Sequence, residues 1–221
     1  MMTTNKLTKT FASGSLAIGV LAGAVLTATS ASAVTLTWAA WTGGTPLEVG
    51  DKIVKYVPNL AALDPLNPIG AEPEDEVMLN RMGNDHYYFV YDAMNGSSPF
   101  NASSGSFTYT IEVINSPKSI VGVDLNSNVS SNYGDITEKF TEISNVLVST
   151  NGLPVPLSGF EPIAPKKLLT VTNTLTDPMS PTEGLFQLQN SFHQSVPEPG
   201  TILGLLAVGG LGLVSRFKKQ K

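Results

Sequence analysis

The chain has 221 residues, with 18 Asp and Glu, 13 Lys and Arg, and no cysteine. The missing cysteine excludes disulfides, thiol catalysis and thiolate metal sites. Residues 34–196 hold seventeen of the carboxylates but seven of the cations, a net charge of −10 against −5 for the whole chain. This acidity argues against nucleic acid as a partner, because nucleic-acid binding rewards basic surfaces.

The first predicted element is an export signal. Lys6 and Lys9 precede an uncharged stretch of apolar and small residues from 11 to 28. Ala31-Ser32-Ala33 then matches the A-x-A pattern of a signal-peptidase site. We therefore predict a signal peptide over residues 1–33, cleaved between Ala33 and Val34. The alternatives are a retained transmembrane helix, which the small residues before the site disfavour, and a buried core helix.

Residues 34–190 predict a β-rich extracytoplasmic domain. In segment 106–113, Phe107, Tyr109, Ile111 and Val113 alternate with polar residues, as in a strand with one buried face. Further strand-like segments are 35–39, 52–57, 86–91, 119–125, 145–149, 167–175 and 184–188. Short strands separated by Gly, Pro, Asn and Ser favour a mainly β fold, an antiparallel β-sandwich of jelly-roll-like or Ig-like type.

Other segments carry helix or loop signals. Asp135-Ile-Thr-Glu138 predicts a helix cap and a short helix through Glu142. Dense prolines predict long connections over 59–75 and 154–165, and residues 191–200 are expected to form a linker.

The sequence shows no convincing catalytic site. His86 and His193 stand 107 residues apart, and a histidine metal site would need both to converge with a carboxylate. We expect them to lie separately at the surface or a sheet edge. No G-x-S-x-G elbow occurs. The acidic run 72–76 offers paired carboxylates for a glycosidase, but a solvated loop is the simpler interpretation.

A weak calcium candidate lies between two predicted strands. Oxygen-bearing side chains follow the spacing of a calcium loop, with the candidate ligands Asp124, Asn126, Asn128, Asn132 and Asp135. Val129 stands where such loops need glycine, and the last position is Asp rather than Glu. A polar turn between strands is the alternative, and the sequence predicts no other cofactor.

Five aromatic residues offer a platform for sugar rings: Trp38, Trp41, Tyr87, Tyr88 and Tyr91. Alternation along 86–91 sends neighbouring rings to opposite faces, so we expect one set to be core.

The chain ends in three consecutive features. Val196-Pro-Glu-Pro-Gly200 is followed by an uncharged, glycine-containing segment over 201–215 and a basic tail over 216–221. A helix over 201–215 would span roughly 22 Å, less than the ~30 Å hydrocarbon core. We predict a short transmembrane segment with the tail in the cytoplasm. This segment is too short for a comfortable permanent anchor, which favours a signal that is removed.

These features together resemble a PEP-CTERM sorting signal. The resemblance rests on Pro197, Glu198, Pro199 and Gly200, the apolar segment and Arg216. It implies a bacterial exported protein whose tail a membrane-embedded exosortase recognises and processes near Pro197–Pro199. Proteins with this signal are often associated with exopolysaccharide or biofilm matrix. The resemblance covers the last twenty-six residues and says nothing about 34–195.

The sequence thus predicts an exported protein, membrane-associated during sorting and then at the cell surface or in the extracellular matrix. We expect a non-catalytic role in adhesion or association with exopolysaccharide. The alternative is a secreted carbohydrate-active hydrolase with paired carboxylates.

Overall fold

The computed structural model describes residues 33–60, 64–93, 104–176 and 183–196. The predicted signal peptide up to residue 32 and the predicted transmembrane segment lie outside these ranges. Within the described ranges, no helix has the length and apolar character needed to cross a membrane.

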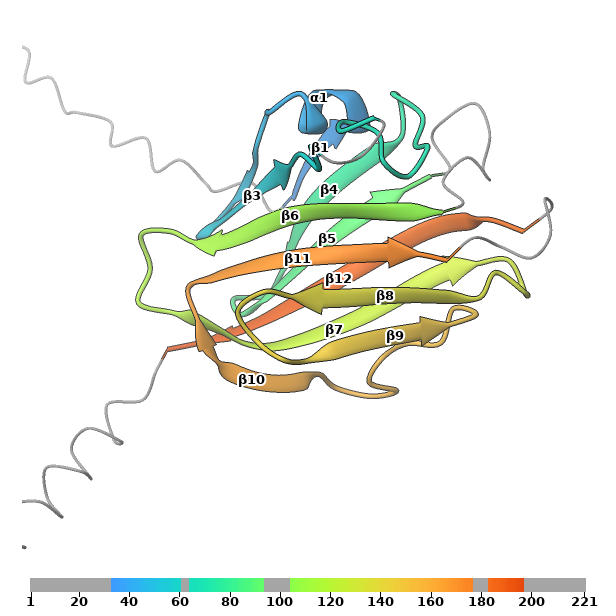
Figure 1. Ribbon diagram of the computed structural model, residues 1–221. Helices are drawn as coiled ribbons and strands as arrows, with labels where there is room; N and C mark the ends of the chain where they lie inside the picture. The colour runs from blue at the N-terminus through green and yellow to red at the C-terminus, as the bar shows by residue number, and fades with distance from the viewer. Residues whose placement is uncertain (1–32, 61–63, 94–103, 177–182, 197–221) are drawn as a thin grey trace, which may run out of the picture.

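Two antiparallel six-stranded sheets form the domain (Figure 1). Sheet A has the order β1 (Ala33–Thr37), β4 (Glu76–Met82), β5 (His86–Asp92), β12 (Leu185–Ser195), β7 (Ser119–Val129) and β10 (Glu161–Lys166). Sheet B has the order β2 (Leu47–Val49), β3 (Lys52–Val57), β6 (Gly105–Val113), β11 (Leu168–Leu175), β8 (Asp135–Phe140) and β9 (Val146–Thr150). The predicted mainly β sandwich is confirmed.

The core lies between the sheets and is rich in aromatic residues. The predicted alternation of β6 holds, since Phe107, Tyr109 and Ile111 are fully buried. Phe89 of sheet A stacks on Tyr109 of sheet B with ring centroids 4.3 Å apart. Such ring pairs add roughly 0.5–1.5 kcal/mol beyond area burial, so this contact helps to hold the two sheets together.

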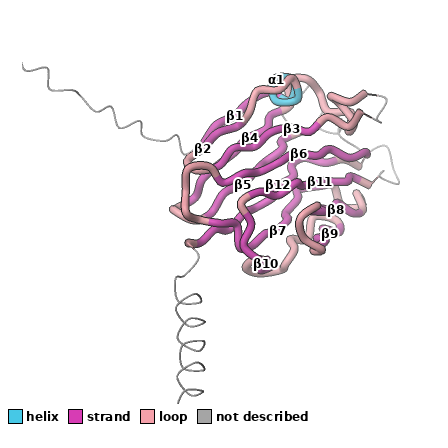
Figure 2. Tube along the Cα trace, turned by 60° about the vertical axis from the view of Figure 1, so that its left-hand side comes forward, coloured by secondary structure: helices cyan, strands magenta, loops and turns pink. Residues whose placement is uncertain are grey.

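One helical turn joins the sheets at the start of the domain (Figure 2). The predicted strand 35–39 ends at Thr37, whose hydroxyl accepts a hydrogen bond from the Ala40 amide at 3.2 Å and caps α1 (Trp38–Thr42). The helix brings Trp38 and Trp41 into the core, with their ring centroids 5.5 Å apart. Helical spacing of the two tryptophans therefore overrides the strand pattern.

Three further boundaries differ from the sequence prediction. The segment expected to be a short helix forms β8, because Ile136, Glu138 and Phe140 all point inward. The proline-rich connection contains β10, an edge strand, where proline is tolerated. The predicted linker begins too early, since β12 continues to Ser195 at the centre of sheet A.

A polar group lies within this core. Asn173 of β11 and Asn190 of β12 exchange side-chain amide hydrogen bonds of 2.8 and 3.1 Å, and the Tyr109 hydroxyl donates to Asn190 at 2.8 Å. Glu138, paired with Asn173 across β8 and β11, is fully buried. Burial, together with the charge of Asp124, raises the pKa of Glu138 well above its ordinary value. Its carboxyl therefore stays protonated far more readily than a solvated one.

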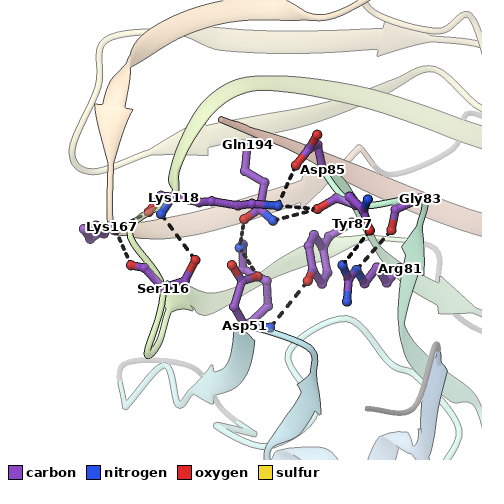
Figure 3. Close-up of polar contacts among 11 residues, drawn as sticks. Asp51, Arg81, Gly83, Asp85, Tyr87, Ser116, Lys118, Lys167 and Gln194 are labelled. Carbon is purple, nitrogen blue, oxygen red and sulfur yellow. Dashed lines mark hydrogen bonds and ion pairs between the residues drawn. The ribbon is translucent and has the colours of Figure 1, made fainter. Parts of the chain in front are cut away.

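A second polar group, the end cluster, links the sheets near the end of β12 (Figure 3). The buried Lys52 ammonium of sheet B bonds to Gln194 of sheet A and to Asp51 at 2.7 Å. It also lies 4.5 Å from the centre of the Tyr87 ring. Lys118 adds contacts to the Asn84 carbonyl at 2.8 Å and to Asp85 at 2.7 Å. The end cluster thus fixes β12 just before the chain leaves the domain.

Candidate functional site

The outer face of sheet A carries ordered rows of polar side chains. Register aligns Asn80, Tyr88, Ser191 and Asp124 across four adjacent strands. The adjacent row on the same face contains Val90, Gln189 and Asn126. Because side chains alternate along a strand, these residues share the face turned away from the core. This face therefore presents amides and hydroxyls from strands far apart in sequence.

A groove lies on this face. It has a volume of about 460 Å³ and is lined by Ala33, Asn80, Arg81, Met82, Tyr88, Val90 and Gln189. A smaller hollow of about 50 Å³ follows on the side of β7, lined by Asn126, Ser127, Asn128, Gln187 and Gln189. Gln189 belongs to both linings, so the two hollows adjoin and extend from β4 to β7.

Both histidines lie beside this groove, contrary to the expectation that they are separate. His86 of β5 and His193 of β12 are direct register partners, with ring centroids 3.8 Å apart. Asp124 of β7 joins them: its Oδ2 is 2.8 Å from His193 Nε2 and 4.0 Å from His86 Nε2. The prediction of separated surface histidines is wrong, because β12 extends into the expected linker and places His193 on the sheet.

Burial lowers the pKa of His86, and charge on His193 would lower it further, while the Asp124 carboxylate opposes the shift. His86 Nδ1 is 3.0 Å from the Tyr88 hydroxyl, which also lies 3.6 Å from Met82 Sδ. The ring of His86 is thus oriented by its own strand neighbour.

Phe160 covers His193 from the other side. Their rings stack with centroids 4.3 Å apart at an angle of 26°. Gly122 is the register partner of His193, and a Cβ added there would overlap the Phe160 ring. The absence of a side chain at Gly122 is therefore what lets Phe160 reach the histidine.

The calcium-loop expectation is not met by the backbone. Asp124, Asn126 and Asn128 occupy alternate positions of the long strand β7, extended along one face. Asp135 begins β8 and accepts a hydrogen bond of 2.6 Å from the Thr150 hydroxyl, while the backbone N–H of Asn132 donates to the Glu183 carboxylate at 3.1 Å. An extended strand cannot wrap its side chains around one ion as a loop does.

The acidic run before β4 is also not a simple solvated loop. Asp75 is fully buried and accepts hydrogen bonds from the Tyr91 hydroxyl at 2.7 Å and the Glu72 amide at 2.9 Å. Of the five aromatic candidates, four are core and Tyr88 alone lies on the outer face. The preference for a core role is thus confirmed for Trp38, Trp41, Tyr87 and Tyr91.

Of the predicted processing residues, the structure describes Ala33. Ala33, the last residue of the predicted signal peptide, is the first of β1 and pairs with Asn80. Ala31, Pro197, Glu198, Pro199, Gly200 and Arg216 lie outside the described residues.

A protein-family comparison identifies the tail. The model of the PEP-CTERM protein-sorting motif matches residues 195–219. The chain ends in a PEP-CTERM sorting motif. The match starts at Ser195, the last residue of β12, so the sorting motif follows the folded domain directly. It marks the chain as an exported protein and an exosortase substrate, sorted at the membrane. No curated protein matches the chain.

Proposed function

We propose that the exported domain is a non-catalytic binding protein of the cell surface or matrix that holds a neutral polysaccharide on the outer face of sheet A. The two adjoining hollows from β4 to β7 support the proposal, because they share Gln189 and together contain five amide side chains. An elongated surface lined by amides suits a chain of sugar rings, because each hydroxyl both donates and accepts hydrogen bonds.

Charge narrows the class of ligand. Residues 34–196 carry a net charge of −10, which disfavours approach of polyanionic glycans at low ionic strength. Tyr88 and Val90 supply apolar surface beside the amides in the groove. Neutral sugars offer both chemistries, since their rings have apolar faces and hydroxyl edges.

Cleavage of the signal peptide would also change the wall of the groove. Register through β1, β4, β5 and β12 places Ala33 and Ser191 in one row, so β1 begins and β12 ends toward the same end of sheet A. Cleavage after Ala33 would remove one residue of the groove wall and widen its entrance.

The test is affinity electrophoresis of the full chain, in mild detergent, through gels that contain neutral polysaccharide from the producing cells. We expect retardation, and a loss of roughly three- to tenfold in affinity for Gln189→Ala, because one amide hydrogen bond contributes about 0.5–1.5 kcal/mol. Asn132→Ala removes an exposed amide elsewhere and should bind as the parent does. Absence of retardation, or equal retardation of the Gln189→Ala variant, would overturn the proposal.

A further inference from the structure

The geometry of His86, Asp124 and His193 points to a binding site for a divalent transition-metal ion of the zinc or copper class. One ligand atom from each residue lies within 4.8 Å of the other two. Ligands about 2.0–2.1 Å from a tetrahedral ion are roughly 3.3 Å apart. The distances from Asp124 Oδ2, 2.8 Å to His193 and 4.0 Å to His86, lie on either side of that value. Side-chain shifts below about 1 Å would therefore equalise them.

An unpartnered ring nitrogen of His86 also favours a metal ion at this site. The Nε2 atom of His86 is buried and has no hydrogen-bond partner among the described residues. If Nδ1 donates to the Tyr88 oxygen, whose own proton points to Met82 Sδ, Nε2 presents an unused lone pair toward Asp124. If the Tyr88 hydroxyl donates to Nδ1 instead, a buried N–H is left without an acceptor. Either state leaves a buried polar atom without a partner, which is unfavourable, and a metal ion on the lone pair removes this cost.

The surroundings hold the ligands in place and leave access for an ion. The Tyr88 hydroxyl bonds to the second ring nitrogen of His86, which is the supporting contact that metal-binding histidines usually make, and the Phe160 ring packs on His193. The side chains of His86, His193 and Asp124 are 25, 20 and 18% exposed. Solvent can therefore supply the ion and a fourth ligand.

The ligand types select the metal. Two imidazole nitrogens and one carboxylate suit zinc and copper, whereas calcium and magnesium require mainly oxygen ligands. The bound ion replaces the proton through which His193 Nε2 bonds to Asp124, and that proton can move to Nδ1 of the same ring. The ion would cross-link β5, β12 and β7 just before the sorting motif begins at Ser195. This site shares Tyr88 with the groove lining but uses none of the groove amides, and metal titration without polysaccharide tests it separately.

The experiment is calorimetric titration of the full chain, purified without a histidine tag, with ZnCl₂ and CuCl₂, and with CaCl₂ for comparison. We expect one zinc or copper ion per chain, a melting temperature that rises with metal concentration, and no comparable response to calcium. The chain contains two histidines and no cysteine, so Cu²⁺ electron paramagnetic resonance should show coupling to two imidazole nitrogens.

The variants separate a metal site from a structural cluster. His86→Gln and Asp124→Asn should each weaken zinc binding at least tenfold, and Tyr88→Phe should weaken it about tenfold by releasing the His86 ring. Asp92→Asn, another carboxylate on the same face, should bind normally. Thermal unfolding in EDTA verifies that each variant is folded. If His86→Gln and Asp124→Asn do not fold, Tyr88→Phe still tests the site, because it removes the hydroxyl and keeps the aromatic ring. No heat with zinc or copper, or undiminished binding by folded His86→Gln, would overturn the inference.

Discussion

Glu138→Gln should change how the stability of the domain depends on pH. Glu138 is fully buried on β8, and burial raises the pKa of its carboxyl well above the ordinary value of 4.5. Above pH 4.5 the unfolded chain releases this proton while the folded chain keeps it. The folded state then binds more protons, so the free energy of unfolding falls as pH rises. The contribution of the protonated Glu138 carboxyl to the free energy of unfolding is fully present below pH 4.5. It is lost as pH rises toward the pKa of Glu138 in the folded state.

The slope of that loss is set by linkage. One proton of difference corresponds to about 1.4 kcal/mol per pH unit. Glutamine has nearly the same shape and cannot ionise, so Glu138→Gln removes this slope while keeping a polar group near Asn190. Relative to the parent, the variant should therefore gain stability progressively from pH 4.5 upward, by about 1.4 kcal/mol for each unit below the folded pKa.

The assay is urea unfolding of parent and variant at half-unit steps from pH 4 to pH 7.5. The difference between the two proteins cancels the titration of all other groups. Glu112→Gln, which removes a carboxylate from an exposed position of the same sheet, controls for net charge. Parallel stability curves for the parent and Glu138→Gln would refute the protonated buried carboxyl.

Two further predictions concern the Gly122–Phe160 contact and the Asp51–Lys52 ion pair. Gly122→Ala should displace the Phe160 ring from His193 and lower stability by about 1 kcal/mol; in thermal unfolding its effect should not add to that of Phe160→Ala, and full additivity would contradict the contact. Burial would raise the pKa of Asp51, but hydrogen bonds from Lys52 and Ser116 and the Lys52 charge lower it to about 2. Its contribution is present above pH 3.8 and lost as pH falls toward 2, so Asp51→Asn should destabilise the domain at pH 7 by roughly 1–2 kcal/mol, allowing for partial exposure. Acid titrations of stability in which parent and Asp51→Asn run parallel below pH 4 would rule out this ion pair.

The fold could be predicted where alternation was clean. In β6 every second residue is apolar and buried, and period two is decisive. In β8 the inward position between Ile136 and Phe140 is Glu138, which hides the alternation and leaves a misleading helix cap. In β12 the inward positions include Asn190 and Gln194, so a central strand resembles a polar linker. Polar residues at core positions are therefore the reason why β8 and the end of β12 were not predicted from the sequence.

A candidate site could likewise be predicted from the sequence only where its residues are close together in the chain. The sorting motif is contiguous, and its order of features is legible from residues 196–221 alone. The approach of His86, His193 and Asp124 depends on the register of three strands. No local signal encodes that register, because it follows from turns and core packing over more than one hundred residues. The calcium pattern was local and misleading, since side chains at alternate positions of a strand lie side by side along one face and do not converge on one ion.

We propose that the exported β-sandwich loses both of its terminal signals. Mass spectrometry of the protein recovered from the surface of producing cells tests this proposal. We expect a chain that begins at Val34 and ends near Pro197–Pro199, before Thr201. A surface protein that still carries residues 1–33, or an intact C-terminus at Lys221, would contradict it.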